Sequence, residues 1–163
     1  MSIIYIIYFH NNNSLKHIEK IISTFEGVQV SLDKNDIKII SDNKNSVLVI
    51  NVDSNNIYVN CYLIKNDIVV AKTLFPNVTT DIRENISPIE WQFSRKKDLY
   101  SILIIQLNDK NIISLNINSI PQSEIFSFEF KDRVYYYSFS EYIDNPIQIE
   151  GLSVDQNIIY RNF

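Results

Sequence analysis

The sequence predicts a mainly β protein, α+β by strict count: an antiparallel meander that curls into a sandwich or barrel, with one N-terminal amphipathic helix at about residues 14–26. Two observations predict this fold class. From about residue 28 to residue 118, short runs rich in Ile, Val and Tyr alternate with turns of Asn, Asp, Lys and Ser, and such turns connect neighbouring antiparallel strands. Ile outnumbers Leu, and Ala71 is the only alanine. The best helix formers are therefore scarce, while residues that suit a pleated surface are plentiful.

The first predicted elements are a strand at residues 2–9 and the helix that follows it. We expect Asn13 or Ser14 to cap the helix, because a short polar side chain can accept a hydrogen bond from a first-turn N–H. Gly27 is the expected C′ residue, where glycine adopts a left-handed conformation without steric cost. His17 falls on the polar side of the helix. One apolar stripe recurs at three- and four-residue spacing and comprises Leu15, Ile18, Ile21, Ile22 and Phe25.

The predicted meander consists of short strands joined by short loops. The strands are residues 28–32, 37–41, 46–52, 57–64 and 68–74. The loops between them are too short for the crossovers that parallel strands require, so the sheet is expected to be antiparallel. The periodicity ends at Phe75-Pro76. Residues 75–98 are predicted to form an irregular connection with a helical turn at residues 80–85.

The rest of the chain is predicted to add two hairpins and a last pair of short elements. These are residues 98–107 with 111–119, 124–130 with 134–140, and 147–149 with 157–160. About ten strands exceed what a flat sheet carries comfortably, hence the expected curling into a barrel or two layers. Tyr135 and Tyr137 share one face of their strand, and Tyr136 points to the other. Either these rings pack against the phenylalanines of the preceding strand, or a tyrosine is presented at a wet protein–protein interface.

The length of 163 residues predicts a single domain, residues 1–163, whose core needs no disulfide or metal. Cys61 is the only cysteine, which excludes an intramolecular disulfide, and its place in an apolar run indicates a small buried side chain. The apolar start has no basic residue ahead of it, and no run reaches the ~20 apolar residues of a membrane span. We therefore expect a cytoplasmic protein with no membrane partner.

The formal net charge of -4 arises in the second half of the chain. Residues 1–75 hold 7 basic and 7 acidic residues, whereas residues 76–163 hold 8 and 12. The one basic cluster, Arg95-Lys96-Lys97, is followed at once by Asp98. Phosphate binding requires clustered positive charge, so no nucleic-acid partner is expected. A protein with a basic surface suits this acidic half better.

The residue types that build catalytic and cofactor sites are scarce. Gly27 and Gly151 are the only glycines, which excludes a glycine-rich nucleotide loop. The only His and Cys residues are His10, His17 and Cys61, so a zinc site with the usual spacing is not expected. We predict no cofactor, no metal site and no catalytic residues.

The predicted partner-binding surface combines a tryptophan, a tyrosine and acidic side chains. Trp91 is the only tryptophan and follows Glu90 in the irregular segment, and loops and tryptophans are common at recognition sites. In the alternative interpretation, Ile89, Trp91 and Phe93 form a strand that anchors Trp91 in the core. The predicted contact residues are Asp81, Glu84, Glu90, Trp91, Tyr136, Glu141, Asp144 and Asp155.

We therefore predict a non-enzymatic protein-binding module: a small acidic cytoplasmic inhibitor of the immunity-protein type, which caps a basic partner such as a toxin nuclease. Two alternatives stay open. One is a small-molecule carrier built as a β-barrel. The other is a carboxylate- or histidine-based hydrolase that uses Glu84, Glu90 or His10. The sequence predicts no oligomeric state, although Lys38 and Lys72 would discourage pairing between strand edges.

Overall fold

A computed structural model describes residues 12–41, 46–53, 55, 58–76, 87–96, 100–118, 120–140, 143 and 146–162. The chain divides into two compact units, Met1–Val78 and Thr79–Phe163, and each unit is described by itself. The described residues form one α-helix, one short 3-10 helix and eleven strands in three antiparallel sheets. The predicted mainly β fold with an N-terminal helix is therefore confirmed. The single domain stays a prediction, and the strand at residues 2–9 and the helical turn at residues 80–85 lie outside the described residues.

The helix α1 (Asn12–Glu26) ends where the sequence predicts and begins earlier. Both expected capping residues, Asn13 and Ser14, lie inside the helix, so that prediction is wrong. Gly27 has a φ of 70°, and its N–H donates to the carbonyl of Ser23 at 2.9 Å. This left-handed residue ends the helix in the manner expected of glycine.

The segment after the helix is not the predicted strand at residues 28–32. Its N–H groups bond to helix side chains: Val30 donates to Ser23 Oγ at 2.9 Å, and Leu32 donates to Glu19 Oε1 at 2.9 Å. Leu32 is also buried against the helix and the sheet. The alternating pattern therefore reflects packing on the helix, because the helix supplies hydrogen bonds that a neighbouring strand would otherwise provide.

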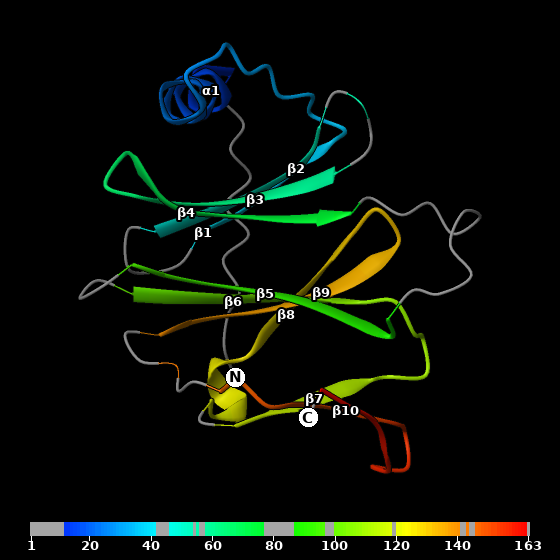
Figure 1. Ribbon diagram of the computed structural model, residues 1–163. Helices are drawn as coiled ribbons and strands as arrows, with labels where there is room; N and C mark the ends of the chain where they lie inside the picture. Colours follow the sequence, from blue (N-terminus) through cyan, green and yellow to red (C-terminus); the bar gives the residue numbers. More distant parts are fainter. Residues whose placement is uncertain are drawn as a thin grey trace. The chain divides into compact units, whose positions relative to one another are not determined.

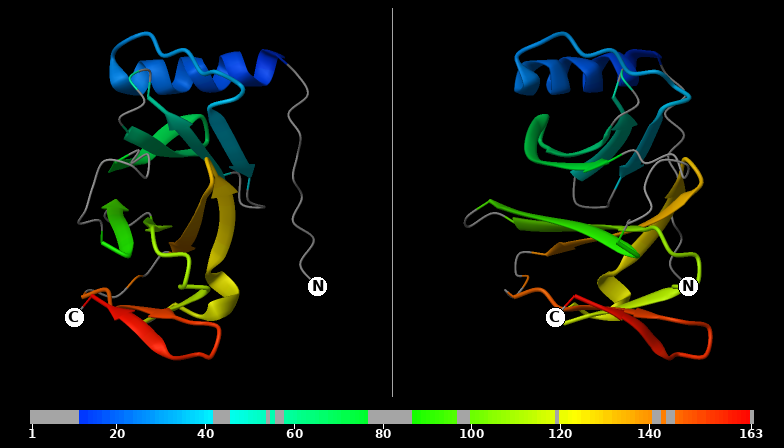
Figure 2. Two further views of the ribbon diagram at one scale, coloured as in Figure 1. Left: turned by 90° about the vertical axis from the view of Figure 1, so that its right-hand side faces the viewer. Right: turned by 45° about the vertical axis from the view of Figure 1, so that its right-hand side comes forward.

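The first unit contains a four-stranded antiparallel meander in the order β1-β2-β3-β4. Its strands are β1 (Ile37–Ser41), β2 (Ser46–Val52), β3 (Tyr58–Lys65) and β4 (Ile68–Pro76). The helix covers one face of this sheet (Figure 1, Figure 2). Ile18 and Ile22 of α1 share a core cluster with Val49 and Ile64. The apolar stripe predicted for the helix is thus its sheet-facing side, and exposed His17 lies on the polar side, as predicted.

The last helical residue, Glu26, bonds α1 to the sheet. Its Oε1 accepts from the Tyr62 hydroxyl at 2.8 Å and from Lys72 Nζ at 2.7 Å. Burial acts to raise the pKa of Glu26, but hydrogen bonds from Lys72 and Tyr62 and the ammonium charge outweigh it, and the pKa is lowered. Burial and the neighbouring Glu26 raise the pKa of Tyr62. On the other face of β3, Cys61 is buried as predicted, and burial raises the pKa of its thiol to about 12.

The second unit contains two antiparallel sheets, in the orders β5-β6-β9-β8 and β11-β10-β7. The strands of the first are β5 (Ile89–Lys96), β6 (Tyr100–Leu107), β8 (Phe126–Phe130) and β9 (Arg133–Ser140). Those of the second are β7 (Ser114–Ile117), β10 (Ile149–Leu152) and β11 (Ile158–Arg161). The 3-10 helix η1 (Gln122–Glu124) precedes β8.

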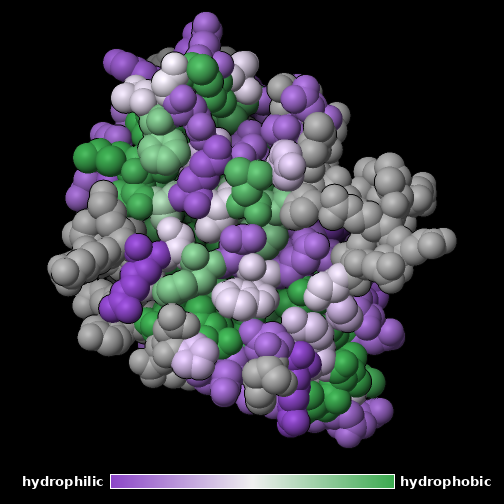
Figure 3. Space-filling model, in the orientation of Figure 1, coloured by the Kyte–Doolittle hydropathy of each residue, from purple (hydrophilic) through white to green (hydrophobic). Residues whose placement is uncertain are grey.

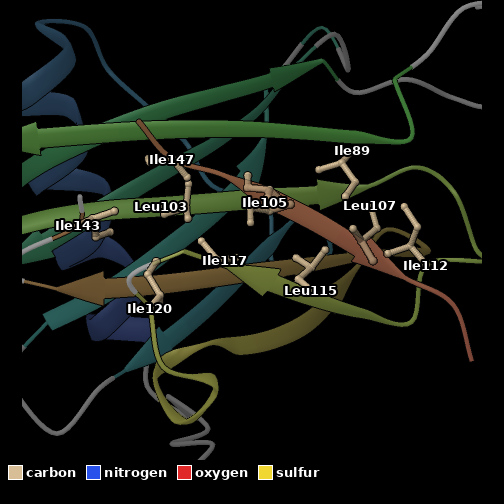
Figure 4. Packing of buried hydrophobic residues seen from close by; sticks show 11 residues of the cluster. Ile89, Leu103, Ile105, Leu107, Ile112, Leu115, Ile117, Ile120, Ile143 and Ile147 are labelled. Atoms are coloured by element: carbon tan, nitrogen blue, oxygen red, sulfur yellow. The ribbon is translucent and has the colours of Figure 1, made fainter. Parts of the chain in front are cut away.

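Eleven buried Ile and Leu side chains lie between these two sheets (Figure 4). Leu103 and Ile105 extend from β6, and Leu115 and Ile117 extend from β7. The second unit is therefore a two-layered sandwich, one of the two forms expected from the sequence. Branched side chains fill the space between its layers, which favours a packed core over the ligand cavity that a carrier requires.

Two connections in the second unit differ from the sequence prediction. Residues 89–96 form the regular strand β5 instead of part of an irregular loop. The expected hairpin of residues 98–107 with 111–119 is also wrong, because β6 pairs with β5 and β9, while β7 pairs with β10. Both edges of β6 are already occupied, so the next segment crosses to the other sheet.

The hairpin of β8 and β9 is confirmed, and its aromatic rings pack across the strands. Tyr135 stacks on Phe128 with ring centroids 5.1 Å apart, and Tyr137 lies 5.5 Å from Phe126. Lys131 and Asp132 adopt φ values of 50° and 59°, a turn geometry that matches the twist of a hairpin. A last pair of short strands is present, as β10 and β11, but β10 covers residues 149–152 and not the predicted 147–149.

Candidate protein-binding surface

The outer face of the sheet β11-β10-β7 carries apolar side chains because of an irregularity in its register. Tyr160 lies opposite Gly151 and packs on the core, whereas Ile158 lies opposite Leu152. Ile159 is therefore an extra residue between the two pairs. Such a bulge turns two consecutive side chains towards one face, where a regular strand would alternate them. As a result, Ile158 and Ile159 both face outward, together with Leu152.

These residues belong to a group of apolar side chains that we call the hairpin patch: Ile113, Leu152, Val154, Ile158 and Ile159. Four of them are exposed, with fractions of 73% for Val154, 49% for Ile113, 45% for Ile159 and 43% for Ile158. Ile113 lies beside Leu152, to whose carbonyl its N–H donates at 2.9 Å. In Figure 3, apolar side chains appear among polar ones at the lower right, where Figure 1 places the C-terminal hairpin.

A polar row borders the hairpin patch on the same outer face. The register places Asn116, Glu150 and Arg161 side by side on the three strands. Glu150 accepts from Asn116 Nδ2 at 3.1 Å and from Arg161 Nε at 3.0 Å. The Glu150 side chain is 18% exposed, and that of Arg161 is 52% exposed. The row therefore binds the Glu150 carboxylate within the sheet and leaves the guanidinium half in contact with solvent.

The turn between β10 and β11 holds Val154 and Asp155 at its tip. The N–H of Ser153 donates to the carbonyl of Asn157 at 2.9 Å, and the N–H of Gln156 donates to the carbonyl of Ser153 at 3.0 Å. The Ser153 hydroxyl also accepts from the N–H of Asn157 at 3.2 Å. Gln156 has a φ of 61°. These hydrogen bonds close the turn, and Val154 and Asp155 at its tip are exposed to solvent.

Two asparagine side chains form hydrogen bonds with the backbone at the start of β10. Asn162 Oδ1 accepts from the N–H of Ile149 at 2.8 Å, and its Nδ2 donates to the carbonyl of Ile147 at 3.0 Å. On the other side, Asn118 Oδ1 accepts from the N–H of Gln148 at 2.6 Å. Asn118 Nδ2 donates to the carbonyl of Pro146 at 3.0 Å. Each side-chain amide thus takes the place of a strand peptide in the ladder.

Four of the predicted contact residues lie in the described part of the chain: Glu90, Trp91, Tyr136 and Asp155. Asp155 stands at the exposed turn beside Val154. The Tyr136 hydroxyl donates to the carbonyl of Ile113 at 3.1 Å, so Tyr136 supports the hairpin patch from the core side. Burial raises its pKa. Asp81, Glu84, Glu141 and Asp144 lie outside the described residues.

Glu90 and Trp91 belong to the other sheet of this unit. Trp91 is partly buried against the core, as in the alternative interpretation of the sequence. Glu90 faces the opposite way and lies across from Gln106. Gln106 is fully buried, and its Nε2 donates to Asn108 Oδ1 at 2.9 Å. The structure therefore places Glu90 beside Gln106 in the sheet β5-β6-β9-β8, whereas the hairpin patch belongs to the sheet β11-β10-β7.

The chemistry of the described residues adds little to this surface. The described ranges contain no group of three or more His, Cys, Asp and Glu residues able to hold a metal ion. Of the residues named for the hydrolase alternative, Glu84 and His10 lie outside these ranges, and that alternative stays a prediction. Within the same ranges, no helix is both long enough and apolar enough to cross a membrane.

Comparisons with known proteins add no identification: no family model, no curated protein and no solved structure matches this chain.

The sequence identified Asp155 by its charge and missed Ile158 and Ile159. Both isoleucines lie in a run that reads as an ordinary short strand. In a regular strand, side chains alternate, so one of the two isoleucines would face the core; only the register with β10 shows the bulge. The one sequence signal for an outward-facing pair is the tyrosine that follows, because Tyr160 supplies the side chain that packs on the core.

Proposed function

We propose that this chain is a protein-binding module that docks a partner protein on the hairpin patch. The observation that carries the proposal is the exposure of Ile158 and Ile159 on the outer sheet face, with exposed Val154 at the adjoining turn and a hydrogen-bonded polar row beside them. An apolar centre with a polar rim is the usual anatomy of a protein–protein interface. Exposed apolar groups that adjoin one another mark such sites more strongly than scattered ones.

The finer proposal is a small acidic cytoplasmic inhibitor of the immunity type, which caps a partner with a basic surface. The excess of four acidic residues in residues 76–163 supports it, as does Asp155 at the tip of the turn. An acidic surface attracts a basic partner over a distance and raises the association rate at low salt. The inhibitor would then bind through the hairpin patch and be guided by its charge.

The proposal is tested by capture of partners from cells that express the chain at its native level. Ile158→Asp places a charge at the centre of the patch, and Val28→Asp is a matched control, because Val28 is 63% exposed in the first unit. A genuine partner is retained by the unmodified chain and by Val28→Asp and lost by Ile158→Asp. If all three bind the same proteins equally, the hairpin patch is not the docking surface.

The inhibitor class has its own test, made with the captured partner. The purified partner should lose a toxic or nucleolytic activity when one equivalent of the chain is added. One equivalent of the Ile158→Asp variant should leave that activity unchanged. The association rate should fall as salt rises through the physiological range. A partner whose activity the chain leaves unchanged contradicts the inhibitor class, while binding to the patch itself would stand.

A further inference from the structure

We propose that Glu90 and Gln106 form a binding site for an ammonium group, which donates one N–H to Oε2 of Glu90 and another to Oε1 of Gln106. This inference goes beyond the proposed function and does not rest on it. It rests on two buried acceptor oxygens on neighbouring strands, and on a hydrogen-bond network that fixes the direction of one of them.

The two side chains are direct neighbours on one face of the sheet β5-β6-β9-β8. The register pairs Glu90 of β5 with Gln106 of β6, so both project from the same face with their Cβ atoms about 5 Å apart. Gln106 is fully buried. The oxygens Glu90 Oε2 and Gln106 Oε1 are both buried, and neither has a hydrogen-bond partner among the residues that the structure describes. Because both oxygens only accept, they cannot bond to each other.

The orientation of the Gln106 amide is fixed by Asn108. Asn108 Oδ1 accepts from Arg133 Nη1 at 3.1 Å, and Asn108 Nδ2 donates to the carbonyl of Ser87 at 2.9 Å. A guanidinium only donates and a carbonyl only accepts, so the Asn108 amide cannot be reversed. Asn108 Oδ1 also accepts from Gln106 Nε2 at 2.9 Å. Gln106 cannot be reversed either, because two amide oxygens would then meet, and its Oε1 is therefore the atom left for another donor.

The chemistry of these two oxygens selects a positively charged donor. A buried acceptor without a donor costs free energy, and a charged one costs more. A ligand that removes both costs donates at least two hydrogens and carries a charge opposite to that of the Glu90 carboxylate. An ammonium group has both properties, since its nitrogen carries three N–H donors. Calcium and magnesium ions take six or more oxygen ligands, whereas this pair of side chains offers two.

The site is accessible from the β5 edge of its sheet. β5 is an edge strand, and Glu90 is only partly buried. Gln92, the next residue on the same face of β5, is exposed, as are Ser87 and Pro88 before the strand. A small amine therefore reaches the two oxygens from this edge, and its carbon substituent stays on the solvent side.

Titration of the purified chain with ammonium chloride and with methylammonium chloride tests the site. Such small ligands bind weakly, and a dissociation constant of roughly 5–50 mM is expected. In NMR spectra, the backbone amides of residues 90 and 106 and the Gln106 side-chain amide should shift and saturate. Saturation with ammonium alone identifies the free ion as the ligand, and saturation with both salts identifies a primary amine. If neither salt gives saturable shifts up to about 200 mM, the proposal is overturned.

Two further salts test the need for N–H donors. Tetramethylammonium carries the same charge as methylammonium but has no N–H group, and sodium has the charge alone. At equal ionic strength, neither chloride should shift the signals of Glu90 and Gln106 in a saturable way, because general screening acts on all exposed charges alike. Equal saturable shifts with either salt would show that the site does not select N–H donors, which overturns the proposal.

A pair of substitutions locates the site. In Glu90→Gln, the new amide can donate to Gln106 Oε1 itself, and the charge is gone, so binding should weaken at least about tenfold. Glu124→Gln removes the same charge from an exposed position on η1 and should change the dissociation constant by less than about twofold. Circular dichroism and thermal unfolding check that each variant folds. Equal binding by both variants and the unmodified chain would place the ligand elsewhere and overturn the site.

Discussion

Asn118 and Asn162 bind the same stretch of chain from opposite sides. Asn118 reaches the backbone of Pro146 and Gln148, while Asn162 reaches that of Ile147 and Ile149. Successive peptides of one strand point to alternate sides, so the two amides together satisfy consecutive residues. Side-chain hydrogen bonds therefore hold the start of β10 in strand geometry. The hairpin of β10 and β11, which carries most of the hairpin patch, follows directly in the chain.

Removing one of these amides should destabilise the second unit. Asn162→Ala leaves the N–H of Ile149 and the carbonyl of Ile147 without that partner, which should lower the free energy of unfolding by about 1–3 kcal/mol. Urea unfolding measures it. Asn116→Ala is the control, since Asn116 is exposed and its side-chain amide donates to another side chain, Glu150, and it should cost less than about 1 kcal/mol. Equal losses for the two variants would contradict the role given to Asn162.

Gly151 should tolerate no larger side chain. A Cβ added there would meet the Cδ1 of Ile112 at 3.0 Å and its Cγ1 and Cγ2 at 3.2 Å. Because both residues are buried in the sandwich, Gly151→Ala should cost about 1–3 kcal/mol in stability. Combined with Ile112→Ala, it should cost less than the sum of the single effects, since the colliding atoms are gone. Strict additivity in that cycle would show that the contact with Ile112 is not the cause.

Acid should weaken the first unit through Glu26. Its pKa is lowered in the folded state from an ordinary value near 4.5. The stabilisation is therefore fully present above about 4.5 and is lost as the pH falls through the lower folded pKa. Glu26→Gln should remove this acid-sensitive part, about 1 kcal/mol for a partly exposed pair. Unfolding free energies measured between neutral pH and strong acid test this, and an unchanged pH profile in Glu26→Gln would contradict it.

Alkali should act on the partner of Glu26 in the opposite sense. The pKa of Tyr62 is raised above its ordinary value of 10.0 by burial and by Glu26. Its contribution to stability is present below pH 10 and is lost as the pH rises through the folded pKa. Tyr62→Phe should flatten the alkaline limb of the stability profile. Spectroscopic titration of the tyrosinate provides an independent readout, because one late-ionising tyrosine should disappear in this variant.

The lone cysteine should be inert in the folded protein. Cys61 is 1% exposed, and burial raises the pKa of its thiol to about 12. At pH 8 a reagent therefore cannot reach the sulfur, and the thiol stays protonated. A disulfide reagent should label it only as fast as the chain opens, and immediately in urea. Val154→Cys in a Cys61→Ala background is the matched control, since position 154 is 73% exposed. Fast labelling of Cys61 without denaturant would show that β3 opens readily.

The parts of the fold that were predictable are those fixed by local chemistry. Gly27 ends a helix whose apolar stripe has the right period, and Lys131-Asp132 turns a chain between two aromatic runs. The failures come from tertiary partners. The local sequence pattern does not show that Ser23 and Glu19 accept hydrogen bonds from the N–H groups of residues 30 and 32. The pattern also does not show that β6 pairs with a strand on each of its edges.

The candidate site divides in the same way. Asp155 could be chosen because charge and a turn position are visible in sequence. The assignment of residues 75–98 to an irregular connection was wrong at residues 89–96, because Pro88 and mixed charges obscured the alternation that places Trp91 on β5. Ile158 and Ile159 could not be chosen, since their shared direction depends on which residue of β10 each one faces.

The hydrogen bonds from Val30 and Leu32 to the helix have a consequence for local opening of the chain. They close chain loops of only 7 and 13 residues, so holding this segment on the helix costs little loop-closure entropy. The helix and its trailing segment can therefore open and close as one local unit. In native-state hydrogen exchange, the amides of Val30 and Leu32 should open together with the last turns of α1.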